Sequence, residues 1–144
     1  MSKDLTPESI VAHARSLLGV PFLHQGRDPA TGLDCVGLVF DCARAHGLEL
    51  EDFTAYARTP LGGRMLEEIR ARLPEIRPEE RRDGDVLVFQ RKGRANHVGL
   101  RATAEDGSET VIHSRCVSVD GVTEHRLDGS WLPLLVAAFR LEKK

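Results

Sequence analysis

The first half of the chain carries the spacing of amphipathic helices. After Thr6, which can cap a helix, apolar residues recur every three or four positions until Gly19. A second helix is predicted over about 34–46, because apolar residues share one face there and Gly47 follows as a stop. A shorter amphipathic helix is predicted over 64–73, which ends before a proline. Irregular structure is predicted for 20–33 and 48–63.

In the second half the hydrophobic period changes to that of strands. Segments rich in β-branched and aromatic residues are separated by turn residues, and they span 85–90, 96–103, 109–119, 122–127 and 134–141. Helices followed by a run of antiparallel strands are typical of an α+β fold, here with a sheet of about five strands. The pattern contains no repeat and no linker, so residues 1–144 are predicted to form one domain.

Composition and charge exclude several classes of partner. The chain has 144 residues, 41% hydrophobic and 29% charged, with a net charge of −2. This charge offers no basic surface to nucleic acid or to an anionic membrane, so neither is expected as a partner. No stretch approaches the roughly 18 apolar residues of a membrane span, and the N-terminus lacks the pattern of a secretory signal. We therefore expect synthesis in the cytoplasm without a signal peptide.

Candidate chemistry begins at Cys35, in the stretch GLDCVGLVFDC. The first turn of a helix stabilises a thiolate, whereas the carboxylate of Asp34 disfavours it, so a reactive thiol would need a cationic histidine partner. Cys35 can equally be a small apolar residue at the start of a buried helix. Cys42 and Cys116 are interpreted as core residues. Three cysteines at uneven spacing do not suggest a disulfide framework.

His97 and His113 are the candidate partners of this thiol. They lie in two predicted strands on either side of a turn near Asp106, so a hairpin brings both to one end of the sheet. A five-residue loop would place them on the same face, and a two-residue loop would not. One imidazole would then pair with the thiol while the other orients it. The other histidines are assigned to helices (His13 and His46), to a strand surface (His125) and to the loop before the thiol (His24).

A zinc site is a competing hypothesis. Cys42 and His46 are one helical turn apart, and His113 and Cys116 could add two ligands. Structural zinc sites usually show paired close spacings such as C-x2-C, and this sequence has none. We therefore expect no metal and no other cofactor.

Four motifs in order, LDCVGLV, GDVLVF, NHVGL and VIHS, resemble those of the NlpC-type (NlpC and p-sixty) cysteine peptidases. These are papain-like endopeptidases that act on bacterial cell-wall peptides. The resemblance implies that Cys35 is the nucleophile, His97 the base and His113 the residue that orients it. It implies that Asp34 holds the free amino group of a peptidoglycan peptide, and that the D-γ-glutamyl–diamino acid bond is cleaved without a cofactor.

Two positions depart from the family pattern. Val36 stands where the family usually has serine, and Phe22 stands where it usually has tyrosine. These two residues, with Asp34 and His24, are the candidate substrate-binding residues. The combination PFLHQG and GLDCVGL most resembles the subgroup found in phage tails, which implies tail or particle proteins as partners and a place in a virion acting at the cell wall. The alternatives are an amidase or acyltransferase with the same Cys–His core, or a non-catalytic tail-assembly module.

Overall fold

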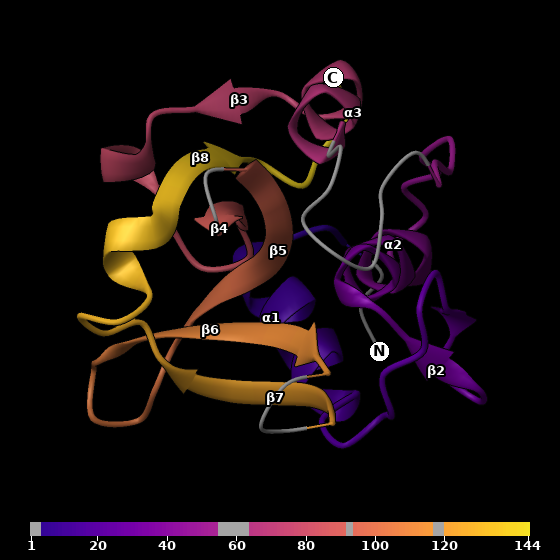
Figure 1. Cartoon of the computed structure of the whole chain (residues 1–144), viewed down its shortest axis with the longest axis horizontal. Helices are drawn as coiled ribbons and strands as arrows, with labels where there is room; N and C mark the ends of the chain where they lie inside the picture. Colours follow the sequence, from indigo (N-terminus) through magenta and orange to yellow (C-terminus); the bar gives the residue numbers. More distant parts are fainter. Residues whose placement is uncertain (1–3, 55–63, 92–93, 117–119) are drawn as a thin grey trace.

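The computed structural model describes residues 4–54, 64–91, 94–116 and 120–144. Within them the helices are α1 (Pro7–Ser16), α2 (Cys35–Ala45) and α3 (Met65–Arg72), with the short 3-10 helices η1 (Pro78–Glu80) and η2 (Leu132–Leu134). The strands are β1 (Arg27–Asp28), β2 (Gly32–Leu33), β3 (Glu75–Ile76), β4 (Val86–Arg91), β5 (Arg94–Thr103), β6 (Glu109–Arg115), β7 (Gly121–Arg126) and β8 (Leu135–Phe139). The helices therefore precede the main strands, and the predicted α+β class is confirmed (Figure 1).

The main sheet has six antiparallel strands in the order β3-β8-β4-β5-β6-β7. The sequence predicted about five, because β3 has only two residues and so shows no periodicity. A further two-stranded ribbon, β1-β2, lies inside the stretch 20–33 that was predicted to be irregular. The strand predicted over 109–119 ends at Arg115, and residues 117–119 lie outside the described part of the chain. Residues 55–63 of the second predicted irregular stretch also lie outside it.

Both long helices begin at the caps that the sequence predicts. The hydroxyl of Thr6 accepts a hydrogen bond from the Ser9 N–H at 3.1 Å, and the Ser9 hydroxyl accepts one from the Thr6 N–H at 3.0 Å. At α2, a carboxylate oxygen of Asp34 accepts a hydrogen bond from the Gly37 N–H at 2.8 Å. These bonds satisfy N–H groups that a helix start leaves without a partner. The cap at Asp34 thus places Cys35 in the first helical position.

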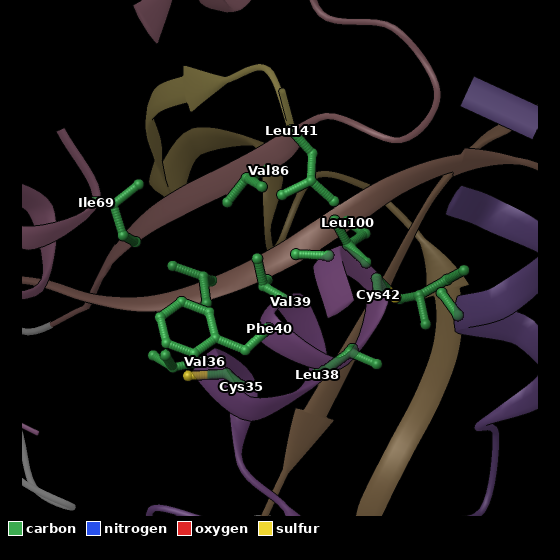
Figure 2. Close-up of a cluster of buried hydrophobic side chains, with 14 of the residues drawn as sticks. Cys35, Val36, Leu38, Val39, Phe40, Cys42, Ile69, Val86, Leu100 and Leu141 are labelled. Carbon is green, nitrogen blue, oxygen red and sulfur yellow. The ribbon is translucent and has the colours of Figure 1, made fainter. Parts of the chain in front are cut away.

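The two faces of the sheet are covered differently. On one face, α1, α2 and α3 pack through the main apolar core, which includes Leu38 and Phe40 of α2 and Val86 and Leu100 of the sheet (Figure 2). On the other face a smaller core gathers around Trp131, from the segment between β7 and β8. None of the helices in the described residues is long and apolar enough to cross a membrane.

The β5–β6 hairpin has the geometry that would bring the two candidate histidines together. The strands are joined by residues 104–108, a five-residue connection, and Leu100 pairs with Ile112. Since alternate residues point to opposite faces, this register places His97 and His113 on the same face. The prediction for a five-residue loop is therefore confirmed. His97 and His113 lie on the face of the sheet that is opposite to the helices.

The three cysteines have different surroundings. Cys42 is fully buried in the main core, as predicted. Cys116 is exposed, so its assignment to the core was wrong. It follows the last residue of β6, where the strand has already ended. Cys35 is buried at the margin of the main core, beside Val36 and Phe40 (Figure 2).

Candidate active site

The Cys35 thiol lies where the start of α2 meets β5. It is 7% exposed, and the backbone N–H groups of Val98 and Val36 donate toward its sulfur. Val98 directly follows His97 in β5, so the fold brings the thiol of the first half of the chain next to the strand that carries the candidate base. The two elements meet because α2 packs across β5 and β6.

The thiol is protonated at rest. Burial and, to a smaller extent, the negative charge of Asp34 raise the pKa of Cys35 to about 12. The N–H groups of Val98 and Val36 and the charge of Arg27 act in the opposite direction, but more weakly. A helix start alone therefore does not make this buried cysteine a thiolate.

Asp34 is held by the protein from three sides. One carboxylate oxygen accepts hydrogen bonds from the Gly37 N–H at 2.8 Å and from the Arg27 guanidinium at 3.0 Å, and the other accepts one from the Gln25 N–H at 2.9 Å. Its exposed fraction is 2%. In this structure Arg27 is the cation that offsets the carboxylate beside Cys35. That Asp34 also holds a substrate ammonium stays a prediction.

Three imidazoles are joined end to end on the sheet face opposite the helices. His97 Nε2 lies 2.7 Å from His113 Nδ1, and His113 Nε2 lies 2.8 Å from His125 Nε2. His125 Nδ1 lies 2.8 Å from the carbonyl oxygen of Arg126. The register of β6 with β7, in which His113 pairs with Thr123, places His113 and His125 on the same face.

Gly99 makes room for this row of rings. A Cβ at Gly99 would lie 2.6 Å from a methyl group of Val111 and 3.1 Å from the Cβ of His113. Val111 and His113 therefore leave no room for a side chain at position 99. The glycine of the NHVGL motif thus has a local reason in the packing of the two histidines.

His97 and His113 are electrically neutral near pH 7. Burial lowers the pKa of His97 to about 3, and the positive charges of Arg91 and Arg115 contribute to the decrease. Burial also lowers the pKa of His113, as do the neighbouring rings of His97 and His125. These directions describe a neutral Cys35 thiol and neutral His97 and His113 rings. They are opposite to the resting thiolate–imidazolium pair that would make Cys35 reactive before substrate binds.

Trp131, the one tryptophan of the chain, packs against all three rings. Its ring centroid lies 5.5 Å from that of His97, 4.9 Å from that of His113 and 5.8 Å from that of His125. It is 8% exposed. The segment that precedes β8 therefore closes the face of the sheet on which the histidines lie.

Sequence reasoning missed His125 and Trp131. His125 was assigned to a strand surface, because it was taken to alternate with the apolar residues Val122 and Leu127. The structure corrects this, because His125 is half-buried and bonded to His113. A signal was available: pairing of β6 with β7 puts His113 and His125 on one face. No local pattern marked Trp131 as the cover.

The other candidate residues lie around the start of α2. Phe22 is half-buried, and its N–H donates to the Asp120 carboxylate at 3.3 Å. His24 is exposed in the same loop. The Val36 side chain is 2% exposed and packs in the main core (Figure 2). Substrate roles for these residues stay predictions, and the burial of Val36 limits it to shaping the core behind Cys35.

The four residues of the zinc hypothesis do not converge. His46 Nδ1 bonds the carbonyl oxygen of Cys42 at 2.8 Å, whereas His113 lies between two histidines and Cys116 is exposed. Over the part of the chain that the structure describes, no group of three or more histidines, cysteines or acidic residues is arranged to hold a metal ion.

The fold, with three helices and a six-stranded antiparallel sheet in the described residues, is papain-like, and comparison with known families agrees. The model of the NlpC/P60 family matches residues 19–139. This chain therefore belongs to the NlpC/P60 family. No curated protein matched the sequence directly.

Solved structures of the same family share the fold. The NlpC/p60 domain of the peptidoglycan hydrolase SagA superimposes with a TM-score of 0.65 and 21% identity, over 93% of this chain and 97% of that one. A family member from Bacillus cereus gives 0.69 and 18%, over 94% of this chain but 40% of that one. RipD from Mycobacterium tuberculosis, described as a non-catalytic NlpC/p60 domain protein adapted to peptidoglycan binding, gives 0.58 and 17%, over 94% and 97%.

Proposed function

We propose that this protein is a cysteine peptidase that hydrolyses an amide bond in peptidoglycan peptides. One observation carries the proposal: the Cys35 thiol at the start of α2 receives the N–H of Val98, next to His97, whose ring is bonded to His113. A nucleophile, a base and an orienting group are the parts that acyl transfer requires. Several family members, SagA among them, are described as peptidoglycan hydrolases.

The first half of the reaction forms an acyl-enzyme. His97 takes the proton of the Cys35 thiol as the sulfur attacks the carbonyl carbon, and the Cys35 backbone N–H at the start of α2 stabilises the oxyanion. The C–N bond then breaks, and His97 gives its proton to the leaving amine. Because both groups are neutral at rest, transfer of the proton accompanies attack and does not precede it.

The second half releases the product. His97 takes a proton from water, whose oxygen attacks the thioester carbon. The C–S bond breaks, the peptide leaves as a carboxylic acid, and the thiol proton returns to Cys35. Every step uses side chains of this protein.

The finer assignment rests on the motifs of the sequence. The bond is the one between D-γ-glutamyl and a diamino acid, and the protein acts as a component of a phage tail or phage-like particle that opens the cell wall. The stretches PFLHQG and GLDCVGL support the assignment to a phage tail or phage-like particle.

The proposal is tested by the release of peptides from purified cell wall. Cys35→Ala is expected to abolish release while the circular dichroism spectrum is unchanged. Cys116→Ala is the matched control, because it removes an exposed thiol and is expected to keep full activity. Equal release by wild type and Cys35→Ala would refute a cysteine peptidase.

Non-catalytic binding of peptidoglycan is the second candidate function. The burial and raised pKa of the Cys35 thiol favour it, and RipD is described as a protein of this kind. A binding module would sediment with insoluble cell wall equally well as wild type and as Cys35→Ala, and neither would release peptides. Release by the wild type alone excludes it. If release occurs, analysis of products formed with water or with an added amine separates a hydrolase from an acyltransferase.

A further inference from the structure

His125 completes a row of hydrogen bonds that runs from a backbone carbonyl to the candidate base. We infer that His125 is a positioning residue that determines which nitrogen of His97 is free to take the thiol proton. This inference rests on the proposed function. It goes beyond the Cys–His–His arrangement, because His125 touches neither the thiol nor the reacting atoms but acts through His113.

The direction of the hydrogen bonds follows from the carbonyl oxygen of Arg126. A carbonyl oxygen can only accept, so His125 Nδ1, 2.8 Å away, carries a hydrogen. In a neutral ring the other nitrogen, Nε2, is then an acceptor. His113 Nε2 must therefore donate to His125, which leaves His113 Nδ1 as the acceptor from His97 Nε2.

The tautomer of His97, the last ring in the row, follows from these hydrogen-bond directions. With its hydrogen on Nε2, neutral His97 has a bare lone pair on Nδ1. That nitrogen is the only one in the ring that can accept the Cys35 proton. The other tautomer would place a hydrogen there and remove the base without any change in the positions of heavy atoms.

The burial of the row gives His125 this influence. His113 is 0% exposed and packs against Trp131, so no solvent competes for its ring nitrogens. A buried N–H without an acceptor is strongly unfavourable. If His125 cannot accept, His113 would avoid this cost by moving its hydrogen to Nδ1 and donating to His97, which reverses the row and protonates His97 on Nδ1.

Two variants separate this role from simple packing. His125→Leu removes the acceptor, whereas His125→Gln offers an amide oxygen to His113. His13→Gln is the control, since His13 has a single ion-pair partner, Asp41, on the other side of the molecule. The tautomers of the wild type and of all three variants are read from long-range ¹⁵N–¹H nuclear magnetic resonance spectra of the imidazoles near pH 7.

We expect His97 to carry its hydrogen on Nε2 in the wild type and in His125→Gln, and on Nδ1 in His125→Leu. The kcat of His125→Leu is expected to fall about tenfold or more, with KM unchanged and most of the loss restored in His125→Gln. An unchanged His97 tautomer in His125→Leu would refute the inference. The spectra decide this even if the wild type does not hydrolyse cell wall, an outcome that would instead refute the proposed function.

A separate observation concerns two arginines beside the same rings. Most arginines of the described structure bind a carboxylate, and Arg91 and Arg115 bind none, although every aspartate and glutamate of the chain is described. Their guanidinium carbons lie 5.2 Å and 5.1 Å from the centroid of Trp131. The Nε of Arg115 is buried and has no hydrogen-bond partner in the described structure.

We propose that Arg91 and Arg115 bind a carboxylate of the peptide substrate, which also rests on the proposed function. A γ-glutamyl linkage uses the side-chain carboxyl group and leaves the α-carboxylate free, close to the bond that is cut. A guanidinium with an unused donor is suited to such a group. Both arginines are near enough to His97 to oppose its protonation, so a bound carboxylate would offset their charge when His97 takes the thiol proton.

The carboxylate is tested with a matched pair of γ-glutamyl peptides, one with a free α-carboxylate and one with an α-carboxamide. Binding is measured by calorimetry on Cys35→Ala, and cleavage is measured on the wild type. We expect the carboxylate peptide to bind about tenfold more tightly, and Arg115→Gln to remove this preference, whereas Arg77→Gln, at an exposed pair with Glu80, keeps it. If wild type cleaves both peptides with equal kcat/KM, the carboxylate site is refuted and the peptidase stands.

Discussion

The two faces of the sheet divide stability from chemistry. The face under the helices is covered by the large apolar core, to which Leu38, Val86 and Leu100 contribute without exposure. The opposite face has a smaller core, and beside it lie three imidazoles and two arginines around Trp131. Cys35 lies at the border, on a helix of the first face and beside a strand whose His97 belongs to the second. The site thus uses a rigid apolar layer to hold a polar one.

The largest effect on activity is expected from the polar face. His97→Gln removes the base and should lower kcat by a factor of about 10² to 10⁴, because general base catalysis contributes on this scale. The midpoint of urea unfolding is expected to change little. If the fraction of folded His97→Gln fell as much as its activity, the division of stability and chemistry between the two faces would be contradicted.

The largest effect on stability is expected from the apolar face. Leu38 is 0% exposed, and Leu38→Ala leaves a cavity in the main core, which should lower the free energy of unfolding by about 2–5 kcal/mol. Urea denaturation measures this change. The activity of the folded fraction should stay near that of wild type, and a selective loss of kcat would contradict the comparison.

Acid should destabilise the protein through the polar face. In the unfolded chain His97 binds a proton below its ordinary pKa of about 6.5, whereas in the folded protein its pKa is about 3. The unfolded state therefore binds more protons between these values, and stability falls as pH decreases from 6.5 toward 3, by up to about 1.4 kcal/mol per pH unit. Urea unfolding between pH 6.5 and 5 measures this slope, and His97→Gln should reduce it to the part that the lowered pKa of His113 contributes.

The smallest effect concerns the resting thiol. With a pKa of about 12, Cys35 should react with iodoacetamide more slowly than an ordinary thiol at pH 8, and its rate should still rise above pH 9. The exposed Cys116 in the same protein is the internal control, read by peptide mass spectrometry. Fast labelling of Cys35 well below pH 8 would instead show a resting thiolate–imidazolium pair.

Local signals in the sequence were sufficient for the elements that hold the nucleophile and the base. The cap at Asp34 predicted where α2 begins, and the hairpin predicted that His97 and His113 meet at one end of the sheet, while their shared face depended on a loop length that the sequence left open. Both depend on neighbours along the chain or on a single hairpin. The motifs around Cys35 and His97 supplied the family, which its family model confirms.

The remaining features depend on contacts between distant segments. Strand β3 has two residues, too few for a period, and is defined only by its partner β8. The burial of His125 follows from the segment around Trp131, which covers a face that the strand pattern alone leaves open. The raised pKa of Cys35 likewise follows from burial by both halves of the chain, which no local pattern reports.

The central claim is that the Cys35 sulfur becomes acylated by a cell-wall peptide. Intact-protein mass spectrometry of the wild type, quenched in acid during turnover of peptidoglycan fragments, tests this directly. We expect an adduct with the mass of the acyl fragment that maps to Cys35 and is absent from Cys35→Ala. Release of the same fragments with no adduct on Cys35, or with undiminished release by Cys35→Ala, would contradict the account.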